Sequence, residues 1–353
     1  KCEKSIYHPS CFDVEIPKLM DSPTNLSMEE SFAVTKIIQD KDTSYQYCHV
    51  LGHNLSAKET KKDPSKWKEV ITRCPNGLCS NGCIHGSFQE RFRSDSLPDE
   101  KIVQIKPDLM DVCEAKGDWH PTRLEQASCY HALGHLTMYM TKANIPISLN
   151  LCQEIAKRDD GRDYAKVCFD GVFMQIFQPL EPEDFSLVAG KQPKKDTLLS
   201  FCDEYKGIHR GSCISESWPL FFQELKDPSG VVKFCAMEEL TEQDRCYDGI
   251  IYVMTAQQNF DEKKMSSYCA GLPQKRRGGC FGSVVSRFIE TDYRNISKAV
   301  NFCKESLKFD TAGKCYDALV KQSSFDFNIG SSQLSELCNN LPEPWKSKCF
   351  GNK

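Results

Sequence analysis

Several common signatures are missing from this chain of 353 residues, and each absence excludes a class of protein. No run approaches the ~18 consecutive apolar residues of a membrane-spanning helix. The net charge is −4, from 45 basic and 49 acidic side chains, whereas a general nucleic-acid binder is expected to be basic. The sequence therefore predicts neither a transmembrane segment nor a nucleic-acid partner.

Catalytic and cofactor motifs are also absent. The chain has no Gly-x-Ser-x-Gly nucleophile elbow, no P-loop and no Gly-x-Gly-x-x-Gly after a strand. It contains no Cys-x-x-Cys, which removes the usual signal of zinc ribbons, thioredoxin-type sites and haem attachment. These absences favour a protein without catalytic activity over an enzyme.

Cysteine, by contrast, is abundant, with 20 in the chain. In the C-terminal half the cysteines form pairs with an offset of 11 or 12, and the first member advances by 33 to 35 residues from pair to pair. A fixed period in this range is typical of stacked helical hairpins, and the pairing predicts one disulfide per hairpin. The predicted pairs are Cys202 with Cys213, Cys235 with Cys246, Cys269 with Cys280, Cys303 with Cys315, and Cys338 with Cys349.

The same rhythm continues with longer loops toward the N-terminus. There it predicts Cys152 with Cys168, Cys113 with Cys129, and Cys74 with Cys83. Cys48 then resembles the second cysteine of a first unit, with Cys11 as its expected partner, which leaves Cys2 for Cys79; spacing alone does not establish these last two pairs. Disulfides form in oxidising compartments, so we expect a secreted or extracellular protein whose signal peptide, if it had one, has been removed.

Each repeat is predicted to hold two helices. The second cysteine of a pair opens helix A, and helix B starts at a capping residue such as Asp261 or Asn295 and ends at the next first cysteine. A small residue usually follows three positions after the second cysteine, which predicts close helix packing; these residues are Gly86, Ala132, Gly171, Gly249, Ser283 and Ala318. The expected fold is all-α, an α/α solenoid of disulfide-stapled helical hairpin repeats of about 34 residues.

Four regions are expected along the chain. Residues 1–40 show no repeat and should form an N-terminal cap or arm, and residues 41–180 should hold the histidine-bearing repeats. Residues 181–197, which are charged and contain two prolines, should form an irregular loop, and residues 198–353 should hold the regular cysteine-paired repeats. Residues 93–112 have a similar composition and are also expected to form a long loop.

One resemblance can be stated on these residues. Ser297-Lys-Ala-Val-Asn-Phe-Cys303 and Gly313-Lys-Cys315-Tyr-Asp-Ala resemble the secreted cysteine-rich, tetratricopeptide-like repeat proteins of Helicobacter. The resemblance, which covers the pattern of residues 110–353, implies a right-handed α/α solenoid with a role in binding. The chain lacks that family's glycine-rich turn after helix A and has a longer cysteine spacing, so no functional residue is transferred.

Histidine is scarce, with eight in the chain, and five fall in three predicted A helices. His49-Val-Leu-Gly-His53 and His131-Ala-Leu-Gly-His135 share one pattern, and His85 occupies the position equivalent to His131 in the helix between them. Two histidines four apart on a helix project from one face and can chelate one metal ion. The sequence therefore predicts a metal site built from these five imidazoles.

Glu90 or Asp170 is expected as an outer or additional ligand of this site. Zinc or copper is the expected metal, since imidazoles suit both and oxidised cysteines cannot bind. Val50 and Ala132 stand where a His-Glu-x-x-His motif carries its catalytic glutamate, so the usual catalytic base of a metalloprotease is missing. A metal-dependent hydrolase or oxidase that uses Glu90 as its base is therefore only the second alternative to a metal-binding protein.

The first alternative to a metal-binding protein is a scaffold without metal, in which the histidines cap helices or hydrogen-bond between repeats. The concave face of the A helices would then bind a protein, a peptide or a glycan, or copies would assemble end to end. Aromatic side chains that could serve such a face are Phe173, Phe177, Trp218, Phe221 and Phe222. Asn-x-Ser sequons predict glycosylation at Asn25, Asn54 and Asn295.

Overall fold

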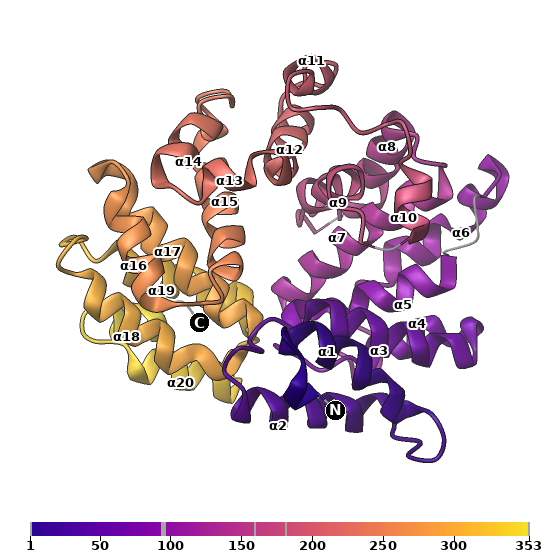
Figure 1. Ribbon diagram of the computed structural model, residues 1–353, viewed down its shortest axis with the longest axis horizontal. Helices are drawn as coiled ribbons and strands as arrows, with labels where there is room; N and C mark the ends of the chain where they lie inside the picture. Colours follow the sequence, from indigo (N-terminus) through magenta and orange to yellow (C-terminus); the bar gives the residue numbers. More distant parts are fainter. Residues whose placement is uncertain (1, 93–96, 159, 181, 352–353) are drawn as a thin grey trace. The chain divides into compact units, whose positions relative to one another are not determined.

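The computed structural model describes residues 2–92, 97–158, 160–180 and 182–351, and its regular elements are helices (Figure 1). The chain divides into two compact units, which are described separately. The first comprises residues 1–121 and 125–168, and the second comprises residues 122–124 and 169–353. The predicted all-α fold is confirmed, although the division falls earlier than the expected loop at 181–197.

The first unit begins with η1 (Cys2–Lys4), α1 (His8–Glu15), η2 (Pro17–Met20), α2 (Met28–Lys41), α3 (His49–Lys62), η3 (Pro64–Lys66) and α4 (Trp67–Thr72). It continues with η4 (Cys79–Asn81), α5 (Gly82–Phe92), α6 (Asp99–Asp111), α7 (Arg123–Met140) and α8 (Ile145–Ala156), and α9 (Ala165–Phe177) crosses into the second unit. Around α3 lies a core of buried side chains that includes Met28, Phe32, Tyr45, Leu51, Leu55 and Val70. The described residues before Asp42 thus pack apolar side chains such as Met28 and Phe32 against α3.

The second unit contains α10 (Pro182–Leu187), α11 (Leu198–Cys202), α12 (Ile208–Glu216), η5 (Trp218–Phe221), α13 (Phe222–Leu225), α14 (Pro228–Cys235) and α15 (Gln243–Gln257). It ends with α16 (Glu262–Gly271), α17 (Gln274–Thr291), η6 (Tyr293–Asn295), α18 (Ile296–Ser306), α19 (Lys314–Asp326), α20 (Ser332–Asn340) and α21 (Trp345–Gly351). Helices A form one layer in which α15 packs on α17, α17 on α19 and α19 on α21, while α14 packs on α16 and α18 on α20.

The disulfides join helix B of one hairpin to helix A of the next, as the spacing predicts. All eight pairs from Cys74–Cys83 to Cys338–Cys349 form as expected, with sequence separations of 9, 11, 12 or 16. In the chain-entropy model, closing a loop of about a dozen residues stabilises the fold by roughly 3 kcal/mol. Each disulfide therefore supports a hairpin that cannot bury its apolar face alone.

The expected pairing of Cys2, Cys11, Cys48 and Cys79 is wrong. Cys2 joins Cys11 within the N-terminal cap, and Cys48 joins Cys79 across 31 residues. Cys48 lies just before α3 and Cys79 begins η4, just before α5. Because α3 and α5 pack closely along their lengths, their N-terminal ends lie together. Cys48 therefore pairs with a cysteine of the next helical repeat, within the same compact unit.

Three local expectations also change. The segment 93–112 contains α6, whose buried Ile102 and Leu109 anchor it in the first unit; residues 93–96 lie outside the described part. Within 181–197, α10 adds a short helix, and residue 181 is not described. Asp261 caps α16 by accepting from the backbone N–H of Lys264, as expected, but the Asn295 side chain makes no such bond for α18.

Candidate metal centre

Close contact between α3 and α5 builds the centre of the histidine cluster. A Cβ at Gly82 would lie 2.2 Å from the backbone oxygen of His49, and a Cβ at Gly86 would lie 2.1 Å from that of His53. Only glycine allows backbones to approach so closely. The two glycines, four residues apart, match the two histidines, also four apart, so His85 between the glycines faces the His49–His53 pair.

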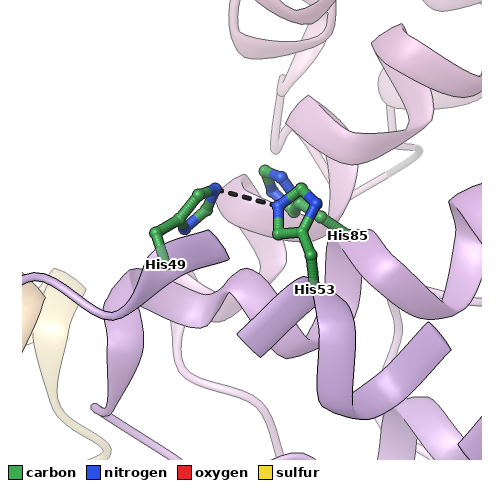
Figure 2. Close-up of side chains that lie close together, drawn as sticks. All are labelled: His49, His53 and His85. Atoms are coloured by element: carbon green, nitrogen blue, oxygen red, sulfur yellow. Dashed lines mark hydrogen bonds between the residues drawn. The ribbon is translucent and has the colours of Figure 1, made fainter. Parts of the chain in front are cut away.

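His49, His53 and His85 point toward one another (Figure 2), and each offers a ligand atom within 4.8 Å of the others. All three are buried, with exposed fractions of 9, 8 and 8%. The Nε2 atoms of His49 and His53 lie 3.1 Å apart. Two nitrogens bound tetrahedrally to one zinc at about 2.0–2.1 Å would be about 3.3 Å apart, so this pair is close to the spacing that a metal requires.

The remaining ring nitrogens of this triad contact oxygen atoms. His49 Nδ1 lies 3.3 Å from the carbonyl oxygen of Cys79 and 3.2 Å from that of Ser80, and His53 Nδ1 lies 3.3 Å from Oε1 of Gln89. Since these oxygens only accept, each Nδ1 carries the proton that is donated. Metal-binding histidines commonly donate their second nitrogen to an oxygen in this way, which fixes the ring and directs the other lone pair at the metal.

These hydrogen bonds determine which nitrogen of each neutral ring carries the lone pair. If Nδ1 of His49 and Nδ1 of His53 both hold a proton, both Nε2 atoms carry lone pairs, and these face each other across 3.1 Å. Two acceptors at that distance repel unless a cation or a proton lies between them. His85 is oriented differently: its Nε2 donates to the carbonyl oxygen of Ser128 at 3.1 Å, which leaves Nδ1 with the lone pair.

The other predicted pair extends the cluster along α7. The ring of His131 stacks on that of His85 with centroids 5.5 Å apart, and the ring of His135 lies 6.0 Å from His85. The Nε2 atoms of His131 and His135 are 3.3 Å apart, and His131 Nδ1 lies 3.1 Å from the carbonyl oxygen of Val167. The five predicted imidazoles therefore gather in the first unit, although the set within 4.8 Å contains only His49, His53 and His85.

Burial and neighbouring charge govern protonation at the centre of the cluster. The pKa of His85 is held well below its usual value, first by burial and then by repulsion from the four other imidazoles. A buried ring that resists protonation keeps its nitrogen lone pair available at neutral pH. This electrostatic setting favours binding of a metal cation, which replaces the protons.

The set of ligand atoms within 4.8 Å includes neither Glu90 nor Asp170. Glu90 lies on α5 five residues after His85, which places the two side chains about 140° apart around the helix. Asp170 belongs to the second unit, and its role as an outer ligand stays a prediction. The 20 cysteines are all in disulfides, so none supplies a thiolate.

The three sequons differ in their surroundings. Asn25 is exposed in the turn before α2. The side-chain amide of Asn54 donates to the backbone oxygen of Asp13, and that of Asn295 donates to the backbone oxygen of Phe288. The Asn25 amide also donates, to the backbone oxygen of Pro23 at 3.4 Å, so hydrogen bonding does not separate the three sequons. Asn25 is exposed, whereas Asn54 and Asn295 are half-buried, which makes Asn25 the most accessible of them.

Sequence reasoning missed the oxygen atoms that orient the triad. Cys79, Ser80 and Asn81 all adopt positive φ angles of 52, 49 and 57°, and this left-handed turn directs two carbonyl oxygens at His49. The Ser-Asn-Gly sequence that follows Cys79 is a turn signal that could have marked the segment. The contribution of Gln89 had no such signal, because it depends on the packing of α5 against α3.

Among the described residues, no helix is both long and apolar enough to cross a lipid bilayer. No protein-family model, no curated protein and no solved structure matches this chain.

Proposed function

We propose that this chain binds a transition metal ion, zinc or copper, through His49, His53 and His85. The observation that carries the proposal is the pair of facing Nε2 atoms 3.1 Å apart, whose rings are each oriented by an oxygen at Nδ1. With both Nδ1 atoms protonated, the two Nε2 lone pairs repel unless a proton or a cation lies between them, and a bound metal ion would find two ligands at suitable spacing. His85 adds a third nitrogen from the neighbouring helix.

The donor set favours zinc and copper. Three neutral imidazoles without a thiolate suit both ions, and three protein ligands leave a fourth position for water or another ligand. Ten disulfides indicate an oxidising compartment, where an extracellular metal-binding protein would work without glutathione reducing its cysteines. His131 and His135 would then extend the site beyond the three central nitrogens.

The experiment is a metal titration of protein purified without a histidine tag. Elemental analysis after purification, followed by titration of the stripped protein with Zn²⁺ and Cu²⁺, should give binding with a defined stoichiometry. His53→Ala should weaken that binding by more than the 10–100-fold typical of changes to residues that merely orient a ligand. His120→Ala, which removes an exposed histidine outside the triad, is the matched control and should bind as the wild type does.

Two results would contradict the proposal. One is a protein that carries no metal and takes up neither ion. The other is binding that His53→Ala and His120→Ala reduce equally, because that would indicate adventitious surface histidines. A parallel measurement on His131→Ala shows how far the site extends along α7.

A further inference from the structure

The second unit contains a polar groove that is lined by residues of helices α15, α17 and α19. Its volume is about 560 Å³, within the range of roughly 300–1,000 Å³ typical of ligand sites. Helix α17 packs against both α15 and α19 and forms the floor between them. All lining residues belong to the second unit, so the groove is independent of the histidine cluster.

Two glycines keep the groove open. A Cβ placed at Gly249 on α15 or at Gly279 on α17 would meet no protein atom within 4 Å. Glycine inside a helix costs up to ~1 kcal/mol relative to alanine, so these positions need another reason. Gly282, by comparison, has a packing reason, since its Cβ would lie 2.8 Å from that of Ala318. The predicted role of Gly249 in close helix packing is therefore wrong, and this glycine instead preserves space above the helix.

The α15 side of the groove is acidic. Asp248 accepts a hydrogen bond from the hydroxyl of Ser283 at 2.9 Å, and no ion pair neutralises its carboxylate among the described residues. Asp248 is exposed, but partial desolvation by the surrounding atoms raises its pKa, while the Ser283 hydrogen bond and the charges of Lys321 and Arg276 act in the opposite direction. Glu290 adds a buried carboxyl group at the floor, where Nε2 of Gln322 donates to it at 3.2 Å.

The α19 side is basic. Lys314 and Lys321 line the groove from α19, and within the described part of the chain neither ammonium group forms an ion pair. Lys314 and Lys321 therefore face Asp248 across α17. Asp244 at the end of the groove is paired with Arg276, whereas Asp248 and the two lysines have no partner of opposite charge at contact distance among the described residues. A ligand that carries both signs would satisfy both sides at once.

The aromatic rings of the groove are already covered. The Arg276 guanidinium lies 4.3 Å from the ring centre of Tyr247, and that of Arg287 lies 4.0 Å from the ring centre of Tyr252. A guanidinium therefore already occupies one face of each ring, where a sugar or an apolar side chain could otherwise stack. Of the aromatics expected from the sequence, Phe173 and Phe177 are buried, and none of the five lines the groove.

We infer that this groove binds an extended peptide segment that presents a basic side chain to Asp248 and an acidic side chain to Lys314 and Lys321. The residues from Asp244 to Tyr252 on α15 line its length, which corresponds to about 12 Å of helix. An extended chain rises about 3.3 Å per residue, so three or four peptide residues fill that length. This places a lysine or arginine within a few residues of an aspartate or glutamate in the partner.

The test uses the full chain and three fluorescent peptides with blocked ends, Gly-Lys-Gly-Glu-Gly, Gly-Lys-Gly-Lys-Gly and Gly-Glu-Gly-Glu-Gly, measured by anisotropy at low salt. We expect the mixed-charge peptide to bind at least about tenfold more tightly than either like-charged peptide. Gly249→Leu fills the groove and should weaken binding by about tenfold or more, while its better helix propensity maintains the thermal midpoint. Gly351→Leu, at a helical glycine with equally open surroundings in α21, is the matched control.

A charge reversal separates ligand recognition from a structural role. Lys321→Glu makes the α19 side less basic, so preference should shift from the mixed-charge peptide toward the doubly basic one. The inference is overturned if no peptide binds below about 1 mM, if all three bind equally, or if Gly249→Leu binds as tightly as Gly351→Leu. None of these outcomes bears on the metal site, because the groove and the histidines lie in different units.

Discussion

Acid should destabilise the metal-free protein through His85, and the size of the effect can be worked out. The pKa of His85 is well below its usual value of 6.5, so the unfolded chain binds a proton that the folded chain does not. The contribution of the neutral His85 ring to the free energy of unfolding is therefore fully present above about pH 6.5 and is lost as the pH falls below that value. One proton corresponds to about 1.4 kcal/mol per pH unit, so the free energy of unfolding should drop by up to about 2 kcal/mol between pH 6.5 and 5.

The assay compares His85→Gln with the wild type in EDTA by urea unfolding across that range. Glutamine can still donate to the carbonyl oxygen of Ser128 but has no charge to gain, so the variant should lose the extra acid sensitivity. Other titrating groups cancel in the difference between the two proteins. If the free energies of unfolding of wild type and His85→Gln fall in parallel with pH, the reasoning is refuted. His120→Gln is the control, and it should keep the acid sensitivity of the wild type.

Three further predictions concern the first unit. Burial raises the pKa of Asp13 to about 6, so stability should fall as pH rises from about 4 to 6, and Asp13→Asn should raise the free energy of unfolding at neutral pH by about 1–3 kcal/mol in urea titrations. Gly86→Ala should destabilise by about 1–3 kcal/mol in the same assay, because its Cβ would meet the backbone oxygen of His53. Replacing Cys48 and Cys79 together by serine should cost about 3–4 kcal/mol and weaken zinc affinity measured by titration, and unchanged affinity would separate the disulfide from the site.

The repeats could be predicted because cysteine spacing reports the period of the hairpins directly. Cys269 with Cys280 and Cys303 with Cys315 link helices that follow one another, so sequence distance and spatial distance agree. That agreement fails for Cys48, which pairs forward to the start of the next helix A. Cysteine spacing does not indicate whether Cys48 pairs with an earlier or a later cysteine, because that depends on how closely α3 and α5 pack.

The histidine cluster was predictable in membership but not in geometry. Counting from the second cysteine placed His85 and His131 at the same position, and the shared His-x-Leu-Gly-His pattern aligned His49 with His131; the structure brings these rings together. The same count treated all five imidazoles alike, whereas the structure separates a central triad from the pair on α7. That distinction depends on ring orientation, which is fixed by backbone oxygens and by Gln89, and neither has a periodic signature in the sequence.

Glycine explains why one end of the chain gathers histidines so tightly and the other holds an open groove. Between α3 and α5, Gly82 and Gly86 let the backbones touch, so side chains that flank the contact are forced together and the imidazoles meet. On α15 and α17, Gly249 and Gly279 face away from any neighbour, and the missing side chains leave a hollow above α17. The repeat pattern places a small residue at Gly86 and at Gly249 alike, but only the neighbouring helix decides whether it brings helices into contact or leaves room for a ligand. Substituting each by alanine should therefore give opposite signs: Gly86→Ala lowers the free energy of unfolding, and Gly249→Ala raises it by up to about 1 kcal/mol.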